Sequence, residues 1–168
     1  MAKGSGRAKA AGGKGGSKQV IATNRKARHN YSILDTYEAG IQLVGTEVKS
    51  LREGQASLAD AFATVDDGEI WLRNLHIPEY HHGSWTNHAP RRNRKLLLHR
   101  SQIDQLLGKT KAKGLTLVPL KLYITARGKA KLELGMGKGK NLYDRRREIA
   151  ARDSKREVER ELAESGRR

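Results

Sequence analysis

The stretch AFATVDDGEIWLRNLHI, residues 61–77, constrains the fold of this chain more than any other. Two runs rich in β-branched, aromatic and other apolar residues flank Asp67–Gly68, a dipeptide that favours the tight turn of a β-hairpin. It is the clearest hairpin signal in the chain. The stretch therefore predicts a fold built on a β-sheet.

Two further stretches have the alternation of strands. An extended chain from Tyr31 to Tyr37 has Tyr31, Ile33, Asp35 and Tyr37 on one side and Leu34 and Thr36 on the other. Ala39–Gly40 predicts a break before the alternation resumes. Residues 115–135 predict a second strand pair with its turn at Arg127–Gly128. Pro119 lies within the first strand of that pair and requires an edge position or a bulge, because proline donates no backbone hydrogen bond.

Helical signals are fewer and shorter. Residues 46–54, TEVKSLREG, predict a short helical segment closed by Gly54. A second helix is expected to begin at Ser101, three residues before Asp104, and to end at Gly108 or Gly114. Five or six short strands with one helix between them favour a mainly β fold, a small β-barrel of the OB type. A two-layer α+β sheet would have much the same pattern.

Positive charge is gathered in blocks along the chain. The net charge is +16, and residues 1–28 carry eight lysines and arginines and no acid. Residues 91–113 hold eight basic residues against the single acid Asp104. Blocks of like charge indicate a polyanionic partner more strongly than a uniform excess would.

Several protein classes are excluded by composition. The chain has no cysteine, which removes disulfides, cysteine-bound zinc and thiol catalysis. No run approaches the roughly 20 apolar residues that span a bilayer, and the basic start lacks the apolar core of a secretory signal. We therefore expect a cytoplasmic protein with no membrane association.

Three segments differ in composition. Residues 1–18 are rich in glycine, alanine, lysine and serine and predict a disordered basic segment, which serves either solubility or direct RNA binding. Residues 19–135 form the expected folded domain. Residues 136–168 form a basic tail whose few apolar residues make no continuous helical stripe, so its helix is expected to be unfolded or fluctuating when free and to order on a partner.

Two catalytic possibilities have little support. Five potential metal ligands lie close together in the polar loop that spans residues 78–95 and just before it, but their spacing fits no standard site: His76, Glu79, His81, His82 and His88. The carboxylates near the hairpin include two in its turn, where aspartate serves the backbone. No nucleophile motif or phosphate-binding loop is present, so we expect no catalytic residue, no metal and no cofactor. A metal-dependent nuclease using the histidine-rich loop remains the enzymatic alternative.

Nucleic-acid binding has the strongest support from motifs. The segments NRKARHNY, residues 24–31, and NHAPRRNRKLLLHR, residues 87–100, mix arginine and lysine with asparagine, histidine or tyrosine. Basic groups neutralise phosphates, and planar groups stack on unpaired bases. Trp71 is expected in the hairpin core. Trp85, in the polar loop, serves either as a lid on the core, the favoured interpretation, or as a stacking platform.

Four segments in the same order resemble the SsrA-binding protein family, also called small protein B (SmpB). They are NRKARHNYSILDTYEAGIQLVGTEVKSLREG, NHAPRRNRKLLLH, GLTLVPLKLY and GKGKNLYDRRREIAARD, and the resemblance runs from about residue 19 to residue 160. It implies an OB-type barrel with accessory helices and no enzymatic activity. The alternative is a generic OB-fold protein that binds single-stranded RNA or belongs to the ribosome.

The resemblance also implies the partners. The family binds the tRNA-like domain of transfer-messenger RNA (tmRNA, also called SsrA) and delivers it to stalled ribosomes for trans-translation, in which nascent chains are tagged and the ribosome is rescued. Elongation factor Tu is expected in the delivery complex. The family's tail forms a helix in the empty mRNA channel and at the 16S rRNA decoding centre.

Candidate RNA-binding residues of the barrel follow from the basic motifs and the resemblance: Asn24, Arg25, Lys26, Arg28, Tyr31, Glu47, Lys49, Ser50, His88, Arg94 and Lys95. Glu47 is an acid among bases. It either forms an internal ion pair with Lys49 or Arg52 or accepts a hydrogen bond from a base or a 2′-hydroxyl.

The tail residues that fall on the family's functional motif are Lys138, Lys140, Tyr143, Asp144, Arg145 and Arg146. Arg145 and Arg146 are expected to contact ribosomal RNA phosphates, and Tyr143 is expected to stack on a base at the decoding site. Arg145 replaces a lysine that is common in the family and keeps its charge. Tyr143 stands where some members have histidine, so it retains stacking but no proton-linked role.

Overall fold

The computed structural model describes residues 18–165, apart from the side chains of residues 112, 113 and 165. Apart from Lys18, the predicted disordered basic segment lies outside these residues. The elements, in chain order, are β1 (Gln19–Thr23), α1 (Arg25–Asn30), β2 (Tyr31–Ile41), α2 (Gly45–Arg52), β3 (Phe62–Asp66), β4 (Glu69–Arg73), a 3₁₀ turn (Ser84–Thr86), β5 (Arg94–Leu97), α3 (Arg100–Lys113), β6 (Thr116–Ile124), β7 (Ala130–Gly139) and α4 (Leu142–Ser165).

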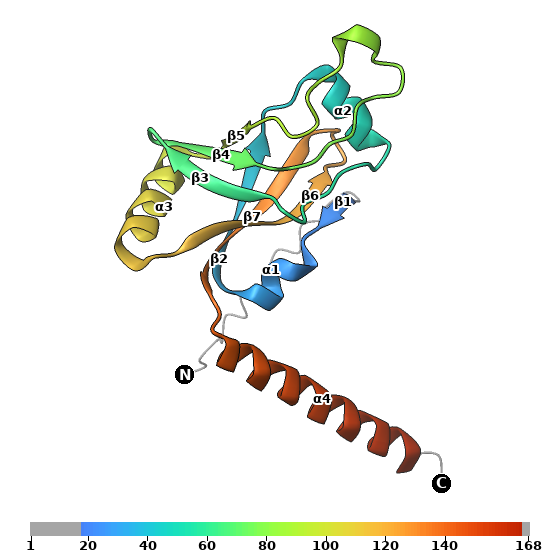
Figure 1. Cartoon of the computed structure of the whole chain (residues 1–168), viewed down its shortest axis with the longest axis vertical. Helices are drawn as coiled ribbons and strands as arrows, with labels where there is room; N and C mark the ends of the chain where they lie inside the picture. Colours follow the sequence, from blue (N-terminus) through green and yellow to red (C-terminus); the bar gives the residue numbers. More distant parts are fainter. Residues whose placement is uncertain (1–17, 166–168) are drawn as a thin grey trace, which may run out of the picture.

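The seven strands form one antiparallel sheet that closes on itself. Their order is β1-β6-β3-β4-β5-β2-β7, and β7 pairs with β6 as well as with β2. The closed circuit therefore runs β6-β3-β4-β5-β2-β7 and back to β6, with β1 added on β6 (Figure 1). The ring confirms the predicted mainly β, barrel-like class with accessory helices, which lie around it.

Alternate residues of the strands form the core inside this ring. Ile70 and Leu72 of β4, and Leu132 and Leu134 of β7, are fully buried. Leu51 of α2 and Leu106 of α3 join the same core. Burying each leucine or isoleucine side chain contributes about 1.5–3 kcal/mol, so this cluster is the main source of stability.

The predicted turns are confirmed by their backbone geometry. Gly68 ends the β3–β4 turn with φ of +73°, and Gly128 lies in the β6–β7 turn with φ of +76°. Pro119 lies at a register shift between β6 and β7, which confirms the predicted bulge. Helix α3 ends at Gly114, with φ of +58°, so the later of the two expected ends is correct.

Two expected boundaries are wrong. Helix α3 is capped by His99, whose backbone N–H donates to Gln102 (3.2 Å), and not by Ser101. Strand β2 has no break at Ala39–Gly40, because Gly40 pairs with both Leu97 and Lys131. A Cβ atom on Gly40 would lie 3.3 Å from Leu97 Cβ, so the glycine permits a close approach between strands and does not interrupt β2.

Strand β7 continues four residues past the expected end of the folded domain. Met136 is buried, and Gly137 and Lys138 pair with Ile33 and Ser32 of β2. These residues therefore belong to the sheet. Figure 1 shows α4 leaving the molecule after them, away from the ring of strands.

Replacing Gly137 with alanine is expected to lower the free energy of unfolding by roughly 1–3 kcal/mol, the usual cost of overpacking. The new Cβ would lie 2.6 Å from the Ser32 carbonyl oxygen, a backbone atom that cannot move without separating β2 from β7. Urea unfolding measures the change. Gly139→Ala is the control, because its Cβ would meet nothing within 4 Å. Equal stability of the two variants would contradict the prediction.

Candidate nucleic-acid interface

Helix α1 presents exposed cations over a small apolar cluster. Asn24 is its cap and is 8% exposed, with Oδ1 accepting a hydrogen bond from the Ala27 N–H (3.1 Å). Tyr31 is half-buried and packs against the cluster beneath the helix. Arg25 and Lys26 are exposed and make no ion pair within residues 18–165. The helix therefore offers two unpaired positive charges to a polyanion.

The same helix carries a third, partly neutralised cation. Arg28 lies 4.0 Å from Glu133 of β7, and its side chain is 72% exposed. An ion pair that is so exposed, with its charged atoms so far apart, contributes little to stability. Arg28 can therefore turn towards a phosphate at small cost. Arg25, Lys26 and Arg28 are hereafter the α1 cations.

Glu47 of α2 lies at the centre of a buried ionic network. Its side chain is fully buried and accepts hydrogen bonds from Arg92 Nε and Nη2 (both 2.7 Å), Arg94 Nε (2.8 Å) and the Val44 N–H (2.9 Å). Burial alone would raise the pKa of this carboxyl. The hydrogen bonds from Arg92 and Val44, with the charge of Arg94, outweigh it and hold the pKa below its usual value. The expected internal ion pair exists, but its partners are these two arginines and not Lys49 or Arg52.

Arg94 is equally enclosed. Its side chain is fully buried, and Nη1 donates to the Leu75 and Arg92 carbonyls (2.6 and 3.0 Å), while Nη2 donates to the Pro90 carbonyl (3.2 Å). Burial lowers the pKa of the guanidinium, and the bonded carboxylate of Glu47 opposes that shift. Arg94 thus fastens the long polar loop to the barrel.

Two further candidates hold the same loop. Ser50 is buried and donates from Oγ to the Pro78 carbonyl (2.7 Å). His88, 7% exposed, donates from Nε2 to the Ile77 carbonyl (3.1 Å), and its Nδ1 lies 3.0 Å from the Thr46 hydroxyl. The side chains of Glu47, Ser50, His88 and Arg94 are enclosed and hold the loop in place, and direct contact of any of them with RNA stays a prediction.

Lys49 and Lys95 remain accessible. The Lys49 ammonium lies 5.3 Å from the centre of the Tyr80 ring, at the edge of an open groove of about 480 Å³ between α2 and the loop. Lys95 of β5 is half-buried and bonded to Glu69 of the neighbouring strand. The ammonium group of Lys49 is therefore available to a phosphate, whereas that of Lys95 can bind a phosphate only after its ion pair with Glu69 breaks.

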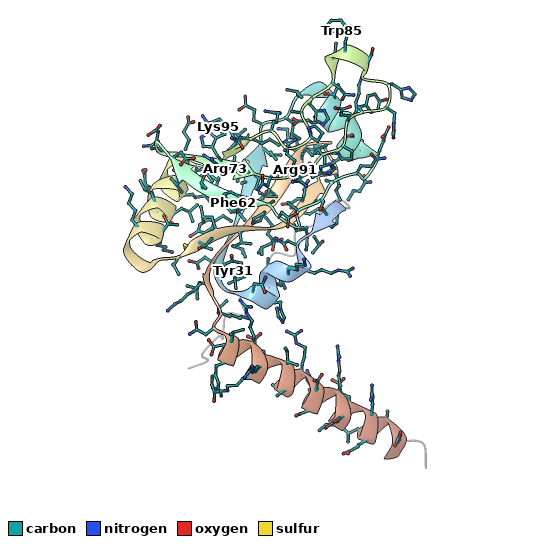
Figure 2. All side chains as sticks on the ribbon, in the orientation of Figure 1. Tyr31, Phe62, Arg73, Trp85, Arg91 and Lys95 are labelled. Carbon is teal, nitrogen blue, oxygen red and sulfur yellow. The ribbon has the colours of Figure 1, made fainter. Side chains whose placement is uncertain are left out.

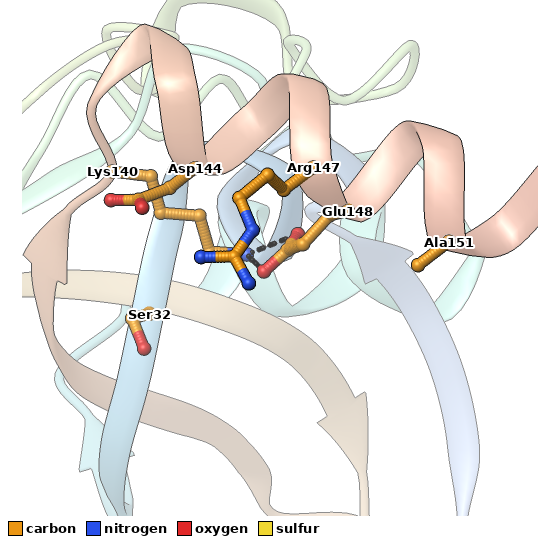
Figure 3. A pocket seen from close by; sticks show the side chains of 6 residues that line it. All are labelled: Ser32, Lys140, Asp144, Arg147, Glu148 and Ala151. Atoms are coloured by element: carbon orange, nitrogen blue, oxygen red, sulfur yellow. Dashed lines mark hydrogen bonds and ion pairs between the residues drawn. The ribbon is translucent and has the colours of Figure 1, made fainter.

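The base of the tail is fixed to the barrel by Lys140. Its backbone N–H donates to the Asn30 carbonyl (2.9 Å), and its Nζ donates to the Arg28 carbonyl (3.1 Å) and to Glu148 (2.7 Å). Figure 3 shows Lys140 and Glu148 in the hollow between α4 and β2. The Lys140 hydrogen bond lowers the pKa of Glu148. Lys140 therefore orients α4 and is largely enclosed.

The rest of the tail motif faces outward. Tyr143 is 70% exposed, and Arg147 lies over its ring at 5.9 Å. Lys138, Asp144 and Arg146 are exposed, and Arg145 is half-buried. Within residues 142–164 no side chain is buried, which agrees with the lack of an apolar stripe. That the helix orders only on a partner stays a prediction.

The core position expected for Trp71 and the lid favoured for Trp85 are both wrong, whereas the stacking platform at Trp85 stays a prediction. Trp71 lies between Ile70 and Leu72, which point inward, so the two-residue period of a strand places it on the outer face, where it is half-buried. Trp85 is 91% exposed and cannot act as a lid on the core (Figure 2).

The clustered histidines do not assemble into a metal site. Among residues 18–165, no three histidine, aspartate or glutamate side chains are grouped so as to hold an ion. His88 is engaged with the loop backbone, and the ring of His82 lies edge-on to Tyr80, 5.5 Å away.

Two ionic features were not anticipated. Arg92 completes the Glu47 network, and no local pattern distinguishes it from its exposed neighbour Arg91. Glu38 accepts hydrogen bonds from Lys131 and Tyr123, and chiefly the Lys131 bond lowers its pKa. Lys131 lies on β7 and Tyr123 on β6, so no local pattern identifies these contacts, which depend on how the strands pair.

None of the helices within residues 18–165 combines the length and the apolar character that a membrane span needs.

Comparison with known proteins covers nearly the whole described chain. The family model for the SmpB protein matches residues 21–164. The SsrA-binding protein of Mycolicibacterium paratuberculosis is 74% identical over 162 residues, which span 96% of this chain and 95% of the relative. That of Mycolicibacterium smegmatis is 74% identical over 144 residues, 86% of this chain and 89% of the relative.

A solved structure has the same architecture. It is described as "tmRNA-SmpB: a journey to the center of the bacterial ribosome", is 57% identical in sequence, and superposes with a TM-score of 0.60. The match covers 71% of this chain and 84% of the other.

Proposed function

The chain belongs to the SmpB protein family, and on that premise we propose that it binds the tRNA-like domain of transfer-messenger RNA and delivers it to stalled ribosomes for trans-translation. The observation that carries this function is the match from residue 21 to residue 164, which includes both the barrel and α4. Relatives 74% identical are SsrA-binding proteins, and the description of the similar solved structure names tmRNA, SmpB and the bacterial ribosome.

In this proposal the work is divided between two parts of the chain. The α1 cations and Lys49 are accessible and suited to RNA phosphates, while the buried Glu47 network keeps α2 and the loop in place for them. Nothing in this role requires catalysis, and the protein acts where ribosomes are, in the cytoplasm. Elongation factor Tu joins the delivery complex.

The tail serves the ribosome. In this proposal α4 enters the empty mRNA channel, where Arg145 and Arg146 contact 16S rRNA phosphates and Tyr143 meets the decoding centre. What supports it is the exposure of Tyr143 and Arg146 on a helix that packs no buried side chain against the barrel. Lys140 sets the direction in which that helix leaves.

The test is the salt dependence of affinity for three RNAs of equal length: the tRNA-like domain, elongator tRNA and an unstructured strand. We expect a preference for the tRNA-like domain that persists as salt rises, because shape contacts do not release counterions. Equal affinities that collapse together with salt would instead indicate a generic OB-fold RNA-binding protein.

The α1 cations give a sharper version of the same test. Arg25→Ala with Lys26→Ala should lower the slope of log affinity against log salt by roughly one unit for each phosphate that the protein no longer neutralises. Lys111→Ala, an exposed cation on α3, is the matched control and should leave the slope nearly unchanged. Equal slopes for all variants would show that Arg25 and Lys26 of α1 neutralise no RNA phosphate.

A further inference from the structure

Trp85 is the most exposed of the large apolar side chains that the structure describes, at 91%. It lies at the tip of the loop between β4 and β5, at the end of the molecule opposite to α4 (Figures 1 and 2). An exposed tryptophan offers a large flat apolar surface, and such surfaces are typical of binding sites. The roles proposed above for the tail and for α1 do not involve Trp85.

The loop around Trp85 is fastened by side-chain bonds to its own backbone. Asn87 accepts from the Tyr80 N–H (3.0 Å) and donates from Nδ2 to the Tyr80 carbonyl (2.8 Å). The Gly83 N–H donates to the same carbonyl (2.8 Å), and the Thr86 hydroxyl donates to the Gly83 carbonyl (2.7 Å). The tip is therefore a closed turn that fixes the backbone on both sides of Trp85.

The backbone at this tip adopts unfavourable geometry. Ser84 has φ of +44°, a left-handed conformation that is unfavourable for a residue other than glycine. A Cβ on Gly83 would lie 2.7 Å from Asn87 Nδ2, so the turn also depends on that glycine. Strained residues persist where the surrounding bonds determine them, and they cluster at binding sites. The strain here holds an apolar side chain in water.

The chain segment that carries Trp85 is basic and contains no acid. From Tyr80 to Ile103 the sequence has no aspartate or glutamate, and Arg91 is exposed and makes no ion pair with any described residue. The groove of about 480 Å³ beside Thr86 and Asn87 is also lined by Lys49, whose ammonium lies over the Tyr80 ring. An aromatic platform next to a cationic groove fits an unpaired base with its phosphate, since each base has a π-face that stacks on aromatic rings.

We propose that Trp85 is a stacking platform for an unpaired base of the tRNA-like domain, with the adjoining phosphate held at Lys49 in the neighbouring groove. This inference rests on the proposed function and adds to it a named contact. The position of the loop favours the carried RNA over the decoding centre, because α4, the segment proposed to enter that centre, leaves from the other end. A duplex does not suit the site, because its base faces are already stacked on one another.

Trp85→Ala is expected to weaken affinity for the tRNA-like domain about tenfold or more, because alanine substitution of an aromatic residue on which a base stacks has an effect of that size. The slope of log affinity against log salt should stay the same, because an indole neutralises no phosphate. Trp85→Phe keeps a ring and should retain most of the affinity. Lys49→Ala is the converse control, and we expect it to lower the slope by roughly one unit.

A fluorescence titration tests the contact directly. Trp71→Phe leaves Trp85 as the only tryptophan of the chain. Its emission should be quenched by the tRNA-like domain and much less by a fully paired RNA hairpin duplex of equal length. Trp85→Phe, which leaves the half-buried Trp71, should show little change with either RNA.

The outcomes separate this inference from the proposed function. If the wild-type protein prefers the tRNA-like domain but Trp85→Ala binds it equally well, the function stands and the stacking contact is wrong. If Trp85→Ala instead weakens only binding to ribosomes free of tmRNA, the platform serves a ribosomal component and the inference fails. If the wild-type protein shows no preference for the tRNA-like domain over elongator tRNA and the unstructured strand, the proposed function itself is overturned.

Discussion

Truncation after Asn141 is expected to abolish tagging of nascent chains on stalled ribosomes while leaving affinity for the tRNA-like domain within about threefold, less than 1 kcal/mol. The truncation removes α4, in which no side chain of residues 142–164 is buried. Residues 142–168 carry nine basic and seven acidic residues, so their loss changes the long-range charge little. Tagging in a reconstituted translation system and RNA binding measured side by side give the result.

The site of the truncation matters because the sheet ends later than composition indicates. A cut after Gly135 would remove Met136, which is 1% exposed, and the part of β7 that pairs with Tyr31–Ile33. Such a protein would lose stability and with it RNA affinity, for a reason unrelated to the tail. The full-length double variant Arg145→Ala with Arg146→Ala is the control that keeps the helix. Loss of RNA affinity after truncation at Asn141 would refute the division of work between barrel and tail.

Glu47→Gln is expected to lower the free energy of unfolding by about 3–5 kcal/mol, the cost of removing one partner of a buried ion pair. The amide keeps the shape of the side chain but leaves the fully buried guanidinium of Arg94 without its counter-charge. It also cannot accept at both oxygens the bonds that Arg92 now donates. Urea unfolding followed by circular dichroism at neutral pH measures the loss.

Glu69→Gln is the matched control for that experiment. Glu69 is bonded to Lys95 on the outer face of the sheet, with both side chains partly exposed, so its loss should cost about 0–1 kcal/mol. If the two variants lost similar amounts of unfolding free energy, burial of the Glu47 network would not explain the effect of Glu47→Gln.

The pH dependence of stability gives a second reading of Glu47. Its pKa is lowered in the folded protein, so the stability from its charged form is complete above the ordinary pKa of 4.5 and disappears as the pH falls through the folded value. The stability gap between wild type and Glu47→Gln should therefore shrink on acidification. A gap that stays constant to strongly acidic pH would contradict the assignment.

Local sequence patterns were sufficient for the main turns, the β3–β4 hairpin and the faces of β2, but they did not predict β1 or α1. Asp67–Gly68 and Arg127–Gly128 specify their turns because few residues tolerate the backbone conformations that the glycines adopt. The alternation from Tyr31 to Tyr37 places its faces correctly because the side-chain period of a strand is two. The lack of an apolar stripe after Gly139 likewise indicated a tail without a packed face. These features depend on neighbouring residues alone.

The tertiary structure decided which charged and aromatic side chains are available to a partner. Arg91, Arg92 and Arg94 look alike in sequence, yet one is exposed and two are bonded to Glu47, an acid 45 and 47 residues earlier in the chain. Trp71 and Trp85 differ from expectation for the same reason, since strand facing and loop closure fix their exposure. Burial depends on contacts between distant segments. Composition therefore predicted a basic RNA-binding protein, and only the folded chain separated the cations that support the barrel from those that can bind RNA.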